Sequence, residues 1–99
     1  MNNQNMQEIN QILNKLKNNS KALSTWKNFL NNIQHYIQQE WLVEGYNPPT
    51  ITELTLIINP FIMNSNKLSI LASILNEYEL TTLFKFMIFG IHNFLKNNK

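Results

Sequence analysis

The chain lacks several residue types on which common activities depend. Its 99 residues include no Cys, no Arg and no Asp. Without Cys it forms no disulfide, no thiolate zinc site and no Cys nucleophile. Gly45 and Gly90 are the only glycines, which excludes a phosphate-cradling loop of the G-x-x-x-x-G-K-[ST] type.

Groups that carry catalysis or bind metals are also sparse. The two His residues, His35 and His92, have no His-x-x-x-His or Glu-x-x-His partner on a helix face. Glu40 and Glu44 are spaced to share a helix face, but no third ligand accompanies them. The Ser, Glu and His residues form no recognised pairing of nucleophile and base. We therefore expect a protein that is not an enzyme, with no cofactor, no metal and no small-molecule substrate.

Charge and hydropathy point to a cytoplasmic chain without a membrane span. Only 14% of residues are charged, the net charge is +2, and no block of like charges appears. The start, MNNQNMQEINQ, is too polar for a signal peptide. The longest apolar stretch, near the C-terminus, holds about 16 residues and contains Lys85, whereas a spanning helix needs about 20. Asn occurs 18 times, a bias that we attribute to an AT-rich genome.

The N-terminal half carries one apolar stripe with helical spacing. Steps of three and four residues, typical of a heptad seam, connect Ile9, Ile12, Leu16, Asn19, Leu23, Trp26, Leu30, Ile33 and Ile37. Only Asn19 interrupts the seam. One interpretation is an elongated helix over about 6–44, near 58 Å long, covered by a partner chain with Asn19 fixing the register. We favour the other, a break at 18–20 with Asn19 or Ser20 capping the next helix.

The next boundary is marked by turn residues and a cap. Gly45, followed closely by two prolines, predicts the end of the second helix. Thr50 and Glu53 match the capping box S/T-x-x-E and predict a short helix over 50–58. A strand is the alternative for this β-branched run, but no second strand is visible to pair with it. The inner side of the helix should carry Ile51, Leu54, Ile57 and Ile58.

The remaining chain predicts two more helices. Asn59-Pro60 should end the short helix, because a residue before Pro avoids the α region. The following helix should carry Leu68, Leu71, Leu75 and Tyr78, and the last should run from about Glu79 to about Lys96. The sequence thus predicts a single all-α domain over 1–99, a small bundle of four longer helices and one short helix, frayed at 1–5 and 97–99.

Four residues stand out as candidates for binding a partner. Phe86 and Phe89 project from the polar side of the last helix, so this helix either lies between two layers or presents aromatic rings to something outside the chain. Trp41 either packs under the loop with the two prolines or anchors an interface, since Trp is favoured at hot spots. Asn19 belongs to this set if the seam is continuous. We therefore expect a non-catalytic regulator or inhibitor that binds a partner protein, a second copy of itself, or both, with the general appearance of small immunity proteins and phage or plasmid regulators.

A local resemblance supplies the alternative. The segment GYNPPTITEL, residues 45–54, resembles the G-Y-x-P-T-x-x-E-[IL] opening of the helix-turn-helix in repressors similar to the SOS repressor. The resemblance implies a DNA-binding segment over 45–76. This chain departs from the pattern by an inserted Pro and by the lack of a Gly-containing turn. Between 66 and 77 only Asn66, Lys67 and Asn76 could reach bases or phosphates.

The position of Phe89 gives a first testable prediction. If its ring contacts a partner, Phe89→Asp abolishes binding with little loss of helicity, because no core contact is removed. Circular dichroism and a binding assay on the same preparation measure both quantities. An unfolded variant would place Phe89 in the core and contradict the assignment.

Overall fold

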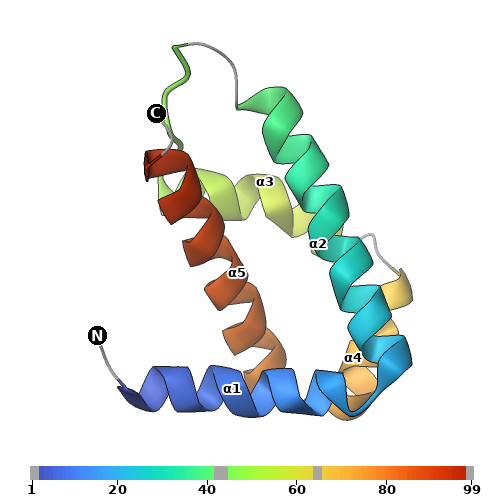
Figure 1. Cartoon of the computed structure of the whole chain (residues 1–99). Helices are drawn as coiled ribbons and strands as arrows, with labels where there is room; N and C mark the ends of the chain where they lie inside the picture. Colours follow the sequence, from blue (N-terminus) through green and yellow to red (C-terminus); the bar gives the residue numbers. More distant parts are fainter. Residues whose placement is uncertain (1–2, 42–44, 64–65, 98–99) are drawn as a thin grey trace.

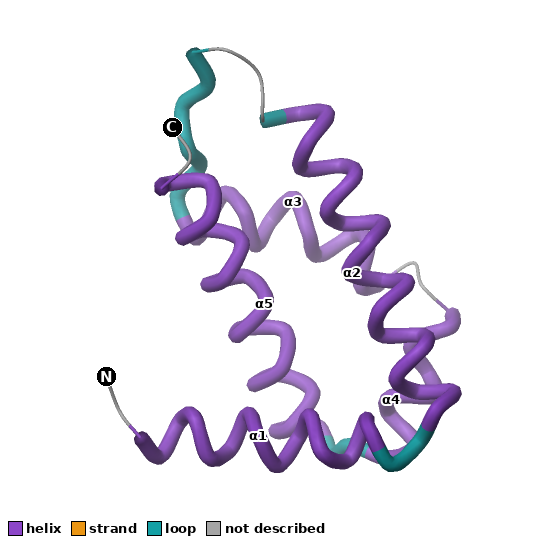
Figure 2. The backbone as a smooth tube through the Cα atoms, in the orientation of Figure 1, coloured by secondary structure: helices purple, strands orange, loops and turns teal. Residues whose placement is uncertain are grey.

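The computed structural model describes residues 3–41, 45–63 and 66–97, and every regular element in this part of the chain is helical (Figures 1 and 2). The elements in chain order are α1 (Asn3–Lys17), α2 (Ser20–Glu40), α3 (Ile51–Met63), the 3-10 turn η1 (Asn66–Leu68), α4 (Ser69–Ile74) and α5 (Glu77–Asn97). α2 and α5 run in the same direction along two sides of the molecule, and α1 crosses the end from which both begin (Figure 1). The predicted all-α bundle of four longer helices and one short helix is confirmed.

The predicted break at 18–20 is confirmed, and Asn19 makes it. Asn19 has extended backbone, with φ −133° and ψ 100°, and its side-chain Oδ1 accepts a hydrogen bond of 3.1 Å from the Ala22 N–H. An N-cap of this kind satisfies one of the unpaired donors of the first helical turn. The chain turns here, so that the apolar stripes of α1 and α2 meet in one core instead of forming one elongated helix.

The end of the second helix differs from the prediction. α2 ends at Glu40, before Gly45, and its C-cap is Trp41, whose N–H still bonds the Ile37 carbonyl at 2.9 Å. The Trp41 ring packs edge-on against the Tyr36 ring, with centroids 6.1 Å apart, which holds the chain as it leaves the helix. Gly45 has the left-handed φ of +77° that favours glycine. Residues 42–44 lie outside the described residues.

The third helix starts as predicted but does not stop at Pro60. The N–H of Glu53 donates to Thr50 Oγ1, and the N–H of Thr50 donates to Glu53 Oε1, each at 3.1 Å, which completes the capping box. The expected break at Asn59-Pro60 is wrong, because α3 continues through Pro60 to Met63. Pro60 has no N–H to donate to the carbonyl of Leu56, four residues earlier. Leu56 is exposed, so water can satisfy that carbonyl. Beyond Pro60, Phe61 and Ile62 pack against the core and hold the last turn in place.

The short helix is therefore α4 and not the predicted helix over 50–58. Leu75 takes an extended conformation and ends α4 after six residues. A second capping box starts α5, since the Glu79 N–H donates to Asn76 Oδ1 at 2.8 Å and the Asn76 N–H donates to Glu79 Oε1 at 3.0 Å. Tyr78, expected on the preceding helix, consequently lies in the first turn of α5 and is exposed.

One hydrophobic core receives side chains from all five α-helices. Its Leu and Ile side chains with the least exposure are Leu16, Ile33, Leu54, Ile58, Leu71, Leu83 and Leu95. Trp26 is buried there too, as the seam predicted. The loop before α3 is tied to this core from outside. The Tyr46 hydroxyl donates to the Leu95 carbonyl at 2.6 Å, which fixes the loop before α3 to the last turns of α5.

Polar contacts fasten α1 to the start of α5. Lys15 Nζ lies 2.6 Å from Glu79 Oε2, and the Tyr78 hydroxyl donates to the Glu8 carboxylate at 3.2 Å. The hydrogen bond from Lys15, together with the N–H of Asn76, lowers the pKa of Glu79 below its ordinary value. Glu79 thus links the position of α1 to the cap of α5.

This arrangement predicts how acid affects stability. A carboxylate whose pKa is lowered by folding stabilises the folded state above its unfolded pKa, and that stabilisation is lost as the pH falls through the lowered value. Urea unfolding between pH 7 and pH 3 should therefore show a loss of stability in acid that is smaller in Glu79→Gln. In Lys15→Gln the pKa of Glu79, followed by NMR, should rise toward its ordinary value. Identical acid dependence in the wild type and Glu79→Gln would contradict the assignment.

Candidate functional site

Three aromatic rings separate the first halves of α2 and α5. Trp26 and Phe29 come from α2 and Phe84 from α5, with centroid distances of 5.8 to 6.0 Å among all three pairs. Offset and edge-on packing at this spacing is the preferred arrangement of aromatic rings. Because these rings are large, they keep the two helices from closing on each other along their length.

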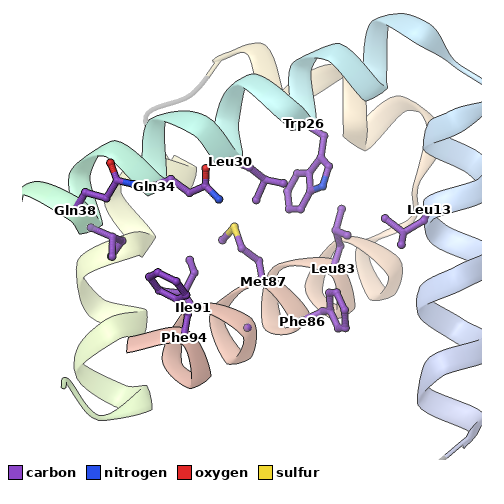
Figure 3. Close-up of a pocket in the computed structure, with 12 residues that line it drawn as sticks. Leu13, Trp26, Leu30, Gln34, Gln38, Leu83, Phe86, Met87, Ile91 and Phe94 are labelled. Carbon is purple, nitrogen blue, oxygen red and sulfur yellow. The ribbon is translucent and has the colours of Figure 1, made fainter. Parts of the chain in front are cut away.

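Next to this ring cluster lies a groove between α2 and α5 of about 630 Å³, here called the α2–α5 groove (Figure 3). Side chains of α2 and α5 form its two walls, and Leu13 of α1 lies at one end (Figure 3). Met87 projects from α5 toward Leu30 of α2 (Figure 3). The full lining is Leu13, Trp26, Leu30, Gln34, Ile37, Gln38, Leu83, Phe86, Met87, Gly90, Ile91 and Phe94.

The groove is apolar and carries no charged lining residue. Its polar side chains are Gln34 and Gln38, which follow one another by one turn along α2 and are both exposed. On the α5 wall, Phe86 and Phe94 are 45% and 47% exposed. Two half-exposed phenylalanines beside an open apolar groove are unusual for a surface that faces only water. The arrangement can cover an apolar surface and offer amide hydrogen bonds at its margin.

Gly90 lies on the same wall, in the interior of α5. Glycine in a helix interior is about 1 kcal/mol less favourable than alanine. A Cβ added at Gly90 would meet no atom within 4 Å, and its φ is not left-handed. Neither the packing nor the backbone of this chain therefore requires glycine at this position.

The structure separates the four predicted binding residues. Phe86 lines the α2–α5 groove. Phe89 is 50% exposed, as expected, but lies on the adjoining flank of α5 and does not line the groove. Trp41 is partly buried in a second aromatic group with Tyr36, whose ring also contacts Phe61 at 5.1 Å. Asn19 caps α2, so the seam role that suggested it as a contact residue does not arise.

The sequence pattern did not single out Phe94 or Gly90 as groove residues. A helical wheel places Phe94 with the buried residues of α5. It gives no signal for Gly90, because a glycine inside a helix has no side chain to assign to a face. A signal was available in the spacing, because Phe86, Gly90 and Phe94 follow one another at four-residue intervals and so form one ridge of the helix. The wheel alone cannot show that Phe86 and Phe94 stay half-exposed beside a groove between α2 and α5.

Catalytic and metal-binding features do not gather at the groove. Within residues 3–41, 45–63 and 66–97, no three His, Cys, Asp or Glu side chains are placed to hold a metal ion. The pKa is lowered for Glu53 by its hydrogen bonds with Thr50, and for Glu79 chiefly by its hydrogen bond with Lys15; neither residue lines the groove. None of the helices in the described part of the chain has the length and hydropathy needed to cross a bilayer.

The segment that resembles a helix-turn-helix forms two helices of unequal length. α3 has 13 residues, whereas α4, where a reading helix would lie, has six. The side-chain oxygen of Asn76 is engaged in the α5 cap. Asn66 is exposed, and the side chain of Lys67 lies outside the described residues. The exposed polar side chains of α4 are Ser69 and Ser73, and Ser73 bonds the Ile70 carbonyl.

Comparison of the chain with models of protein families, with curated proteins and with solved structures finds no match.

The adjacent residues Phe94 and Leu95 test how α5 is oriented relative to the groove and the core. Leu95 is 0% exposed and Phe94 is half-exposed. Leu95→Ala should lower the free energy of unfolding by about 2–5 kcal/mol, because it leaves a cavity in the core. Phe94→Ala should lower it by only about 1 kcal/mol, since about half of the area of that side chain still meets water in the folded chain. Urea unfolding of both variants measures the difference, and comparable losses would mean that Phe94 belongs to the core.

Proposed function

We propose that this protein acts without catalysis, by binding a helical segment of a protein in the α2–α5 groove. The observation that supports the proposal is the open apolar groove with half-exposed Phe86 and Phe94 on one wall. Amphipathic helices bind to such grooves through apolar anchors on one face, placed three or four residues apart. A small helical protein with this surface suits a regulator or inhibitor that works by occupying its partner.

The margins of the groove favour a helix over a small molecule. A small-molecule site normally encloses most of its ligand. Here the rings of Phe86 and Phe94 still meet water at the mouth of the groove, and a ligand confined to the interior would leave them exposed. A helix laid along the groove would cover both rings and could accept or donate hydrogen bonds with Gln34 and Gln38. Such a polar margin around an apolar centre is typical of protein interfaces.

The adjoining flank of α5 extends this surface. Phe89 is one helical turn from Phe86 and half-exposed, and we propose it as a peripheral contact of the same partner. Trp41 would contribute indirectly, because it stabilises the end of α2 through its contact with Tyr36. The groove itself would supply most of the binding free energy, since buried aromatic anchors dominate interfaces.

Photo-crosslinking tests the proposal at single positions. Benzoylphenylalanine at position 86 should give a covalent adduct of discrete mass in the native host, because the partner backbone would lie within reach of the ring. The matched control carries the same group at Leu56, which is 68% exposed on the outer side of α3, and should give no such adduct. Adding Phe94→Asp to the position-86 chain should remove the adduct, since a carboxylate would be buried in the apolar contact. Equal adducts from positions 86 and 56, or none from 86, would overturn the proposal.

A further inference from the structure

The ridge formed by Phe86, Gly90 and Phe94 has the form of a helix-crossing site. Rows of side chains four residues apart are the ridges that interlock in the commonest class of helix packing. In this row the central position has no side chain, so the backbone of a second helix can approach α5 closely at Gly90. The phenylalanines one turn to either side would then flank the approaching helix.

The same ridge is complementary to a copy of itself. In a twofold pair the same patch is used by both partners. Two α5 helices that cross at Gly90 would meet where neither helix has a side chain. Each copy would then direct its phenylalanines toward the groove of the other. The groove lining is uncharged, so identical copies bring no like charges together at its centre. Lys85 and Lys96 occupy the other side of α5, at 100° per residue.

The chain as a whole exposes more surface than a compact monomer of its mass. The accessible surface is 6899 Å², whereas a compact monomer of 11.7 kDa is expected to expose about 5,900 Å². The Cα radius of gyration, 14.1 Å, also exceeds the roughly 13 Å of a compact chain of this length.

We propose that the occupant of the α2–α5 groove is a second copy of this chain, and that the two copies pair through α5 helices crossing at Gly90. The inference rests on the proposed function of the groove and adds the identity of the partner. It also gives a role to the glycine, which the fold of a single copy does not require.

Substitution of Gly90 separates association from folding, because a side chain at this position should stabilise the helix and a large one should weaken self-association. Gly90→Ala should raise the Tm of the dilute protein by about 4 to 8 °C, since alanine favours the helix and its Cβ enters open space. Gly90→Leu should weaken self-association at least tenfold, because its side chain occupies the crossing point. Sedimentation equilibrium over a concentration series measures the dissociation constant of the wild type and of each variant. Leu56→Ser, on the outer side of α3, is the control and should associate as the wild type does.

The outcomes distinguish this inference from the function on which it rests. A wild type that forms dimers, weakened in Gly90→Leu with helicity retained, together with a position-86 adduct of twice the chain mass, supports the pairing. A wild type that stays monomeric at millimolar concentration overturns it; if the position-86 adduct then has another mass, groove binding stands with a different partner. Dimers that Gly90→Leu leaves unchanged also overturn the crossing at Gly90. The absence of any adduct from position 86 would count against the groove itself.

Discussion

The packing of Trp26, Phe29 and Phe84 is the constraint on which the rest of the structure depends. These three rings occupy the space between α2 and α5 with centroids about 6 Å apart, so the helices cannot approach each other as two leucine-lined helices would. The helices α1, α3 and α4 hold this spacing through the common core. The consequence is an apolar groove that no segment of the described chain covers.

Caps and turns decide which surfaces are covered and which are left open. The Asn19 cap turns α1 so that it packs across α2 and α5 instead of extending α2. The reciprocal bonds of Asn76 and Glu79 then start α5 at the point where Lys15 of α1 can reach it. Individual exposed ion pairs contribute little to stability, and the value of this one lies in its position at a helix start. The ends of the helices are thus fixed by local polar contacts, whereas the space between α2 and α5 is set by apolar volume.

Local signals in the sequence predicted much of this fold. The apolar stripe from Ile9 to Ile37, the weak helix formers at 18–20 and the pair Thr50 and Glu53 each act within one or two helical turns. Their consequences were therefore predictable. The continuation of α3 through Pro60 was not, because it depends on contacts of Phe61 and Ile62 with distant residues. The capping box of α5 was missed because Asn76 replaces the Ser or Thr of the usual motif.

The groove was the least predictable feature. Phe86 could be recognised as lying outside the pattern of its own helix, but the gap opposite it results from three rings contributed by two helices. Periodicity within one helix says which side chains share a face and gives no distance to the neighbouring helix. This is why Phe94, which the pattern placed in the core, lies half-exposed on the groove wall.

We propose that the α2–α5 groove is open in the single chain and covered when chains pair. Fluorine NMR of protein labelled with 4-fluorophenylalanine tests it directly, since the six phenylalanines give separate signals whose response to D2O reports contact with water. We expect the Phe86 and Phe94 signals to respond in dilute protein and to lose the response as the concentration rises, while buried Phe29 responds at neither concentration. Signals from Phe86 and Phe94 that are shielded from water in dilute protein, or that still respond in concentrated protein, would contradict it.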